Sequence, residues 1–257
     1  MRARGGVGRL STPWLSLTVG ISAAACFSKE KFVQNLDISR IVLQYLCLLF
    51  SLSVHEAAHA TMANYWGDPT AKLMGRMTLN PVKHADMMGT VLLPLFAMIS
   101  GFPYLFGWAK PVPFNPRNLV DRRRGPVMIA LAGPGSNLLM ILFAAIVLRA
   151  LAAMIGVVES PVLLLFIQAF IYLALINMIL MLFNLIPLPP LDGHHVLEYF
   201  LPPEGQKMLE RIGPYSVFIL FILVFWLRIL TVPMTMMSAA LFYAAFYGTP
   251  MWEIFAG

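Results

Sequence analysis

Residues 53–60 read Ser-Val-His-Glu-Ala-Ala-His-Ala and lie within a continuous apolar run, 41–66. A membrane-crossing helix needs about 20 mostly apolar residues, so this run is long enough to be one. His55 and His59 are four residues apart and share one helix face, where both imidazoles can bind one Zn²⁺ with Glu56 beside them as a base. Ionisable side chains inside a membrane are costly unless they are paired or ligated. The stretch therefore predicts a membrane helix that carries part of a metal site.

The composition is that of a membrane protein. The chain has 257 residues, of which 59% are hydrophobic and 12% charged, and its mean hydropathy is +0.77. A soluble domain has about 45–50% apolar and about 25% charged residues, so the charge available here cannot cover a water-facing surface. The net charge of +6 does not indicate nucleic-acid binding, because the 18 Lys and Arg residues are scattered between apolar runs. We expect an all-α polytopic membrane protein forming one domain over 1–257, surrounded by the lipid bilayer.

About six transmembrane helices are expected. The apolar runs that can form them are 13–27, 41–66, 127–154, 162–186, 215–230 and 232–247. The first run follows several arginines and is either a retained N-terminal span or a signal peptide, of which we favour the retained span. The last two runs are short and separated by a junction with a proline, which we interpret as a C-terminal helical hairpin over 214–248.

A third metal ligand must come from elsewhere in the chain. Catalytic zinc sites normally have three protein ligands and a water molecule. Asp192 is the strongest candidate, because it ends the stretch Asn-Leu-Ile-Pro-Leu-Pro-Pro-Leu-Asp at 184–192, directly after a long apolar helix. The prolines unwind that helix and require a cavity or packed protein around the freed backbone groups. The alternatives lie in polar stretches and are His84, Asp86, His194 and His195.

Three motifs in this order resemble those of the site-2 proteases, peptidase family M50, which are zinc metalloproteases that cut substrates within the membrane. The motifs are His55-Glu56-Ala57-Ala58-His59, Gly133-Pro134-Gly135-Ser136-Asn137 and the segment 184–193 that contains Asp192 and Gly193. The motifs span most of the chain. The chain resembles the small form of the family, without a PDZ or CBS domain. This resemblance implies a catalytic core over about 41–200, although the run 89–107 has no place in the simplest three-helix core.

The resemblance also implies roles for five residues. His55, His59 and Asp192 would ligate one catalytic zinc ion, and Glu56 would be the catalytic base. Asn184 would contact the substrate carbonyl, while a hydrogen bond between helices is an equally open role for it. For Asn137 we favour close helix packing, because small residues precede it.

A small β element near the active site is possible. Residues 71–79 alternate partly between apolar and polar side chains, and prolines favour an extended conformation over 109–114. Either segment could present an edge to an extended substrate. The family is known for such a sheet, so the resemblance favours this interpretation more than the weak alternation does.

Metal binding restricts the topology. The histidine pair and Asp192 lie toward the C-terminal ends of their helices, so helices 41–66 and 162–186 must run in the same direction to bring them together. Only one of the two intervening runs, 89–107 and 127–154, can then cross the bilayer. Because prolines and glycines interrupt 89–107, we expect it to be a re-entrant segment, acting as a lid or as an immobile plug.

This topology places most of the 18 Lys and Arg residues on one face, with Arg122-Arg123-Arg124 as the densest group. Positive residues mark the cytoplasmic side of a membrane protein. We therefore expect a plasma (inner) membrane protein with both termini inside and the active site nearer the cytoplasmic face.

The function expected from these features is zinc-dependent cleavage of transmembrane or membrane-tethered proteins or peptides, in regulated intramembrane proteolysis or clearance of remnant peptides. A divalent-metal carrier and a non-catalytic membrane scaffold are the alternatives that could use the same three ligands. A carrier has no need of Glu56 beside His55, and a scaffold has no need of a complete metal site. The oligomeric state is left open by the sequence.

Overall fold

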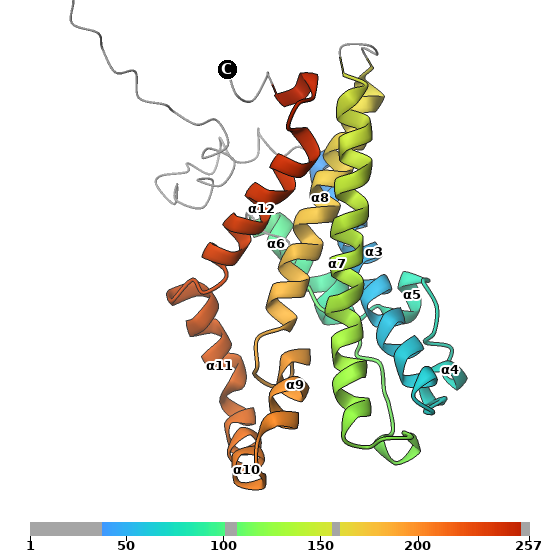
Figure 1. Cartoon of the computed structure of the whole chain (residues 1–257), viewed down its shortest axis with the longest axis vertical. Coiled ribbons are helices and arrows are strands. Elements are labelled where there is room, and N and C mark those ends of the chain that lie inside the picture. Colours follow the sequence, from blue (N-terminus) through green and yellow to red (C-terminus); the bar gives the residue numbers. More distant parts are fainter. Residues whose placement is uncertain (1–37, 101–106, 156–159, 253–257) are drawn as a thin grey trace, which may run out of the picture.

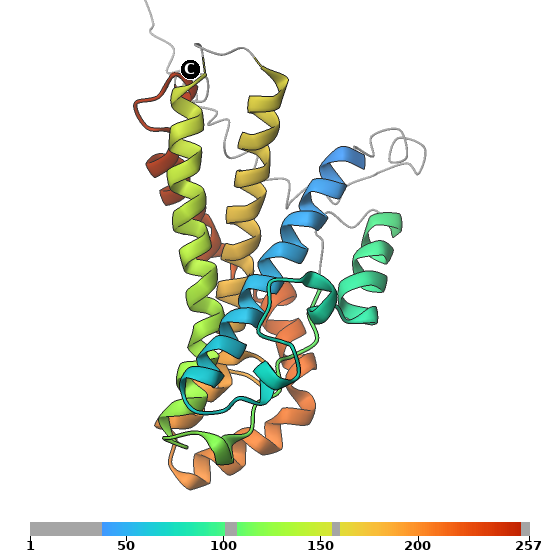
Figure 2. The same ribbon diagram turned by 90° about the vertical axis from the view of Figure 1, so that its right-hand side faces the viewer.

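The computed structural model describes residues 38–100, 107–155 and 160–252 as an elongated bundle of helices (Figure 1). Its three longest helices are α3 (Ile38–Tyr65), α7 (Arg124–Ala153) and α8 (Pro161–Asn184). Both α3 and α8 pack on α7, and α7 runs antiparallel to both of them (Figures 1 and 2). Helices α3 and α8 consequently run in the same direction, as the proposed metal ligands require.

Local sequence explains the ends of α8. The hydroxyl of Ser160 accepts a hydrogen bond from the N–H of Val162, and Pro161 occupies the first helical position. The helix ends at Asn184, three residues before Pro187, which has no N–H to continue the helical hydrogen bonding. The long apolar sequence thus becomes a helix with a defined end at the point where the chain must turn toward α3.

The main apolar core lies where α7, α8 and α12 (Thr231–Phe246) meet. Three alanines at this junction, Ala144, Ala174 and Ala245, are completely buried, one from each helix. Small side chains allow helix backbones to approach closely, which favours association in a membrane, where the hydrophobic effect does not drive helices together.

After α8 the chain forms α9 (Asp192–Phe200), α10 (Pro203–Ile212), the short turn η3 (Gly213–Tyr215), α11 (Ser216–Phe221) and the π-helical turn η4 (Ile222–Trp226). Figure 1 shows α12 meeting α11 at a corner and leading away from it, instead of folding back along it. The expected helical hairpin over 214–248, in which the last helix would fold back along the one before it, is therefore not seen. The physical reason is that α12 finds its packing partners on α7 and α8.

Within the described residues, four helices are long and apolar enough to cross a membrane: Ser39–Tyr65, Arg124–Ala153, Pro161–Asn184 and Pro203–Trp226. Two shorter apolar helices are Met87–Phe96 and Thr231–Phe246. Of the five expected spans within the described residues, four correspond to these long helices, and 232–247 corresponds to the shorter helix Thr231–Phe246. The expected span 13–27 lies outside the described residues.

No β-strand forms in the part of the chain that the structure describes, so the expected β element is not seen there. Residues 71–79 begin within the single-turn helix α4 (Thr70–Leu73) and then turn at Gly75, whose φ is +68°. Residues 109–114 are irregular, because Pro111 and Pro113 have no N–H to donate to a neighbouring strand. Partial alternation alone does not produce a strand when the donors are missing.

The run 89–107 begins within a π-helical turn, η1 (Met87–Leu92), and continues as α6 (Leu93–Ser100). The carboxylate of Asp86 accepts the N–H groups of Met88 and Gly89 and so caps its start. The N–H of Trp108 donates to the carbonyl of Gly89 at 3.2 Å. Both ends of the run therefore lie next to each other.

Candidate metal centre

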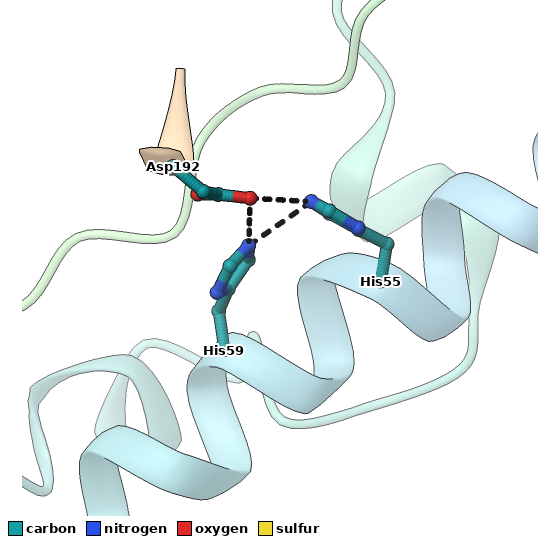
Figure 3. A group of neighbouring side chains, drawn as sticks. All are labelled: His55, His59 and Asp192. Atoms are coloured by element: carbon teal, nitrogen blue, oxygen red, sulfur yellow. Dashed lines mark hydrogen bonds and ion pairs between the residues drawn. The ribbon is translucent and has the colours of Figure 1, made fainter. Parts of the chain in front are cut away.

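His55 and His59 lie one turn apart on α3, and Asp192 is the first residue of α9 (Figure 3). The Nε2 atoms of the two imidazoles are 3.0 Å apart, and Oδ2 of Asp192 lies 3.3 Å from Nε2 of His55 and 3.4 Å from Nε2 of His59. Both histidines are buried. Three ligand atoms from two distant parts of the sequence thus converge on one point, and we call these residues the metal triad.

The metal triad fits a divalent ion. A tetrahedral zinc site with bonds of about 2.0–2.1 Å has its ligand atoms separated by about 3.3 Å, close to the distances seen here. Oδ2 of Asp192 is buried and has no hydrogen-bond donor among the described residues. Two imidazoles and one carboxylate also form the kind of ligand set that zinc enzymes use. The donors present therefore match zinc in type and in spacing.

The turn between α8 and α9 carries Asp192 to α3. The N–H of Leu191 donates to the carbonyl of Leu188, and the N–H of His194 donates to the carbonyl of Leu191. A Cβ on Gly193 would lie 2.4 Å from the carbonyl oxygen of Leu185, so only glycine fits against the end of α8.

Helix α7 forms the other wall of the site. The backbone carbonyl of Ile129 lies 2.7 Å from Nδ1 of His59. This contact orients the ring so that its Nε2 faces the other two ligands of the metal triad. A Cβ on Gly133 would lie 2.4 Å from Nε2 of His59, so this glycine makes room for the imidazole. The sequence predicted close helix packing around Gly133. It carried no signal for the carbonyl of Ile129, because any residue has one.

Glu56 is 8% exposed and lies on α3 next to His55. Its Oε2 accepts the N–H of Val112 at 3.1 Å. Val112 belongs to the irregular segment 109–115, which we call the strap. The strap therefore passes directly over the carboxylate expected to act as the base.

Two buried charged residues tether the strap. The guanidinium of Arg76 donates to the carbonyls of Lys83, Lys110 and Pro111, and this side chain has a relative exposure of only 6%. Asp68 accepts the N–H of Asn115 at 2.6 Å. No sequence signal distinguishes Arg76 or Asp68, because a lone charged residue between apolar runs is most often solvated.

Asp68 is a hub of hydrogen bonds. Besides Asn115, it accepts the hydroxyl of Thr70 and the side-chain N–H of Asn118. Burial raises the pKa of Asp68, but these hydrogen bonds outweigh burial and leave the pKa below its ordinary value. The end of α3, α4 and the strap are therefore held together around one ionised carboxylate.

Asn184 does not join the metal triad, because its side-chain N–H donates to the carbonyl of Leu180 within its own helix at 2.9 Å. The alternative third ligands also lie elsewhere. Asp86 caps η1, and Nε2 of His84 bonds the carbonyl of Thr78. His194 and His195 form a separate group with Glu198 on α9, with one ligand atom from each lying within 4.8 Å of the others.

The chain is similar to curated metalloproteases. A Bacillus subtilis (strain 168) protein named "Putative zinc metalloprotease YwhC" is 38% identical over 188 residues, which are 70% of this chain and 78% of that protein. Two proteins named "Putative zinc metalloprotease Rip2" also match. The Mycolicibacterium smegmatis protein is 30% identical over 68% of this chain and 63% of its own length. The Mycobacterium tuberculosis (strain H37Rv) protein is 29% identical over 81% of this chain and 76% of its own length.

A family model described as "Peptidase family M50" matches residues 146–227. This range includes Asp192 and begins after the histidine pair. No solved structure matches the chain.

Proposed function

Since the chain belongs to peptidase family M50 and is a zinc metalloprotease, we propose that it hydrolyses peptide bonds of transmembrane or membrane-tethered proteins within the bilayer. Convergence of the metal triad on an apolar helix long enough to cross a membrane is the observation that carries this proposal. Release of a tethered regulator and clearance of remnant peptides are the two uses that fit such a reaction.

His55, His59 and Asp192 hold the metal, and Glu56 is the base. When bound, the zinc ion lowers the pKa of a water molecule and polarises the scissile carbonyl. Glu56 takes a proton from the attacking water at its carboxylate and passes it to the leaving amine. For Asn184 we keep the proposal of a contact with the substrate carbonyl, which requires its amide to leave the carbonyl of Leu180.

A helical substrate hides its carbonyls in hydrogen bonds, so it must become extended before cleavage. The strap supports this step, because it lies beside Glu56 and is fixed to the protein through Arg76 and Asp68. An extended substrate segment running along the strap would lie beside the base.

We also propose that 89–107 enters the membrane and returns to the same side. The hydrogen bond between Trp108 and Gly89 supports this, because it joins the two ends of the run. The parallel directions of α3 and α8 support it as well, since only α7 then crosses between them. With the basic segments between α3 and α7 in the cytoplasm, the active site lies nearer the cytoplasmic face of the plasma (inner) membrane.

The test uses purified full-length protein in liposomes with a single-span reporter. Glu56→Gln should keep stoichiometric zinc but lose cleavage by about 10²–10⁴-fold, because general base catalysis typically contributes that much. Asp192→Ala should lose both zinc and cleavage. Glu210→Gln, a change on an exposed face of α10, is the matched control and should alter neither.

Cleavage by Glu56→Gln at the wild-type rate would contradict the proposed base. Stoichiometric zinc in the wild type without cleavage of any membrane-spanning reporter would favour a carrier or a scaffold. A carrier is recognised in the same liposomes by metal flux that Glu56→Gln leaves unchanged.

A further inference from the structure

Asn137 lies on α7, one helical turn after Gly133, and its side chain is completely buried. The nitrogen of its amide is 3.2 Å from Nδ1 of His55. The oxygen of the same amide is buried and has no hydrogen-bond partner among the described residues. An unpaired buried amide oxygen costs about 1–3 kcal/mol, so this arrangement needs an explanation.

The second ring nitrogen of His55, Nε2, explains why the amide oxygen of Asn137 is unpaired. Nε2 of His55 faces Nε2 of His59 at 3.0 Å and Oδ2 of Asp192 at 3.3 Å, so it must present a lone pair to bind a metal there. The proton of the neutral imidazole then resides on Nδ1. A proton on Nδ1 cannot bond to the N–H₂ of Asn137, because both groups are donors.

Turning the amide of Asn137 by 180° resolves both problems at once. The oxygen and nitrogen of an amide are nearly the same size, so the change needs no additional space. The oxygen then accepts the Nδ1–H of His55 and is no longer unpaired. Only this orientation of the amide is compatible with a metal at Nε2.

We propose that Asn137 is a positioning residue of the metal centre, which accepts the Nδ1–H of His55 and so fixes the tautomer that binds the metal. This inference rests on the proposed zinc site. His59 has an equivalent partner in the carbonyl of Ile129. Because Ile129, Gly133 and Asn137 are spaced by four residues, one face of α7 orients both histidine ligands.

The test measures zinc affinity of the purified full-length protein in detergent, by competition with a chromophoric chelator. Asn137→Leu keeps the size of the side chain but removes the acceptor, and we expect zinc affinity to fall about 10- to 100-fold. Asn137→Asp keeps an acceptor in the same place and should stay within a few-fold of the wild type. The Co²⁺-loaded Leu variant should also show shifted absorption bands, because the ligand geometry changes.

Asn177→Leu is the matched control. Asn177 is another completely buried asparagine in the bundle, and its amide donates to Ser51 and to the carbonyl of Leu173. We expect this variant to lower the melting temperature of the metal-free protein without changing the zinc affinity of the folded protein. The same melting experiment on Asn137→Leu separates packing from metal positioning.

Unchanged zinc affinity in Asn137→Leu would overturn the inference, and so would an Asp variant as weak as the Leu variant. Either result leaves the proposed function intact, provided that the wild type binds zinc and cleaves. A wild type that binds zinc without cleaving contradicts the proposed function alone. A wild type without zinc overturns both.

Discussion

At the scale of single residues, the metal centre depends on small side chains and backbone atoms as much as on its ligands. Gly133 lies against the two imidazoles, while Gly135, two residues later on α7, has open space where its Cβ would be. The two glycines belong to one motif but face different surroundings. Only the first can be required for metal binding.

Gly133→Ala should weaken zinc binding. Its new Cβ would overlap His59, and overpacking of this kind costs about 1–3 kcal/mol, so we expect affinity to fall about 5- to 150-fold. Gly135→Ala is the control, and it should keep affinity while raising stability by up to about 1 kcal/mol through its better helix propensity. Equal zinc affinities in the two variants, measured by chelator competition, would contradict this assignment.

At the scale of elements, the strap owes its position to side chains that bond its backbone. Two of its residues are prolines, so it cannot be held by a regular strand partner. Arg76 and Asp68 supply the missing bonds from the segment that follows α3. A change in the charge of Asp68 should therefore alter the position of the strap and lower the free energy of unfolding of the whole chain.

The contribution of Asp68 should disappear in acid. Its folded pKa lies below the unfolded value of about 3.9, so its stabilisation is present above that pH and is lost as the pH falls through the folded pKa. Asp68→Ala should lower the melting temperature at pH 7, with a loss of about 1–3 kcal/mol, and the gap to the wild type should narrow below about pH 4. Melting curves of the detergent-solubilised protein from pH 7 to pH 3 measure this gap.

Glu210→Ala removes a carboxylate from an exposed position on α10 and serves as the control for general effects of charge. A gap between wild type and Asp68→Ala that keeps its size across the whole pH range would contradict the role given to Asp68.

At the scale of the whole molecule, the shared direction of α3 and α8 sets the number of membrane crossings between them. Helix α7 runs antiparallel to α3 and α8, and in the proposed topology it crosses the membrane once, so the chain between α3 and α7 would begin and end on one side. Asn80 and Arg117 are exposed residues within this part of the chain, and Met154 lies at the far end of α7.

Cysteine labelling from either side of sealed vesicles tests this topology. In a background without Cys26 and Cys47, Asn80→Cys and Arg117→Cys should react with an impermeant thiol reagent from the same side. Met154→Cys should react from the opposite side and serves as the internal control. Labelling of the Asn80 and Arg117 variants from opposite sides would show that 89–107 crosses the membrane.

The sequence by itself determined the helical membrane class, the long helices and the candidate metal ligands. The apolar runs are long enough to leave no other stable form in a bilayer, and the spacing of His55 and His59 sets their shared face. The end of α8 near Asn184 followed from the prolines that come after it. These properties are local, so neighbouring residues are sufficient to predict them.

Only the tertiary structure decided how the other parts meet. The partners of Asn137 and Glu56 lie on distant segments, and one of them is a backbone N–H that every residue except proline possesses. The expected β element is not seen in the described residues, because the strap bonds to side chains instead of to a neighbouring strand. The expected hairpin is not seen there either, because α12 packs on α7 and α8. Contacts of this kind depend on which surfaces come together in three dimensions, and no spacing along the chain encodes them.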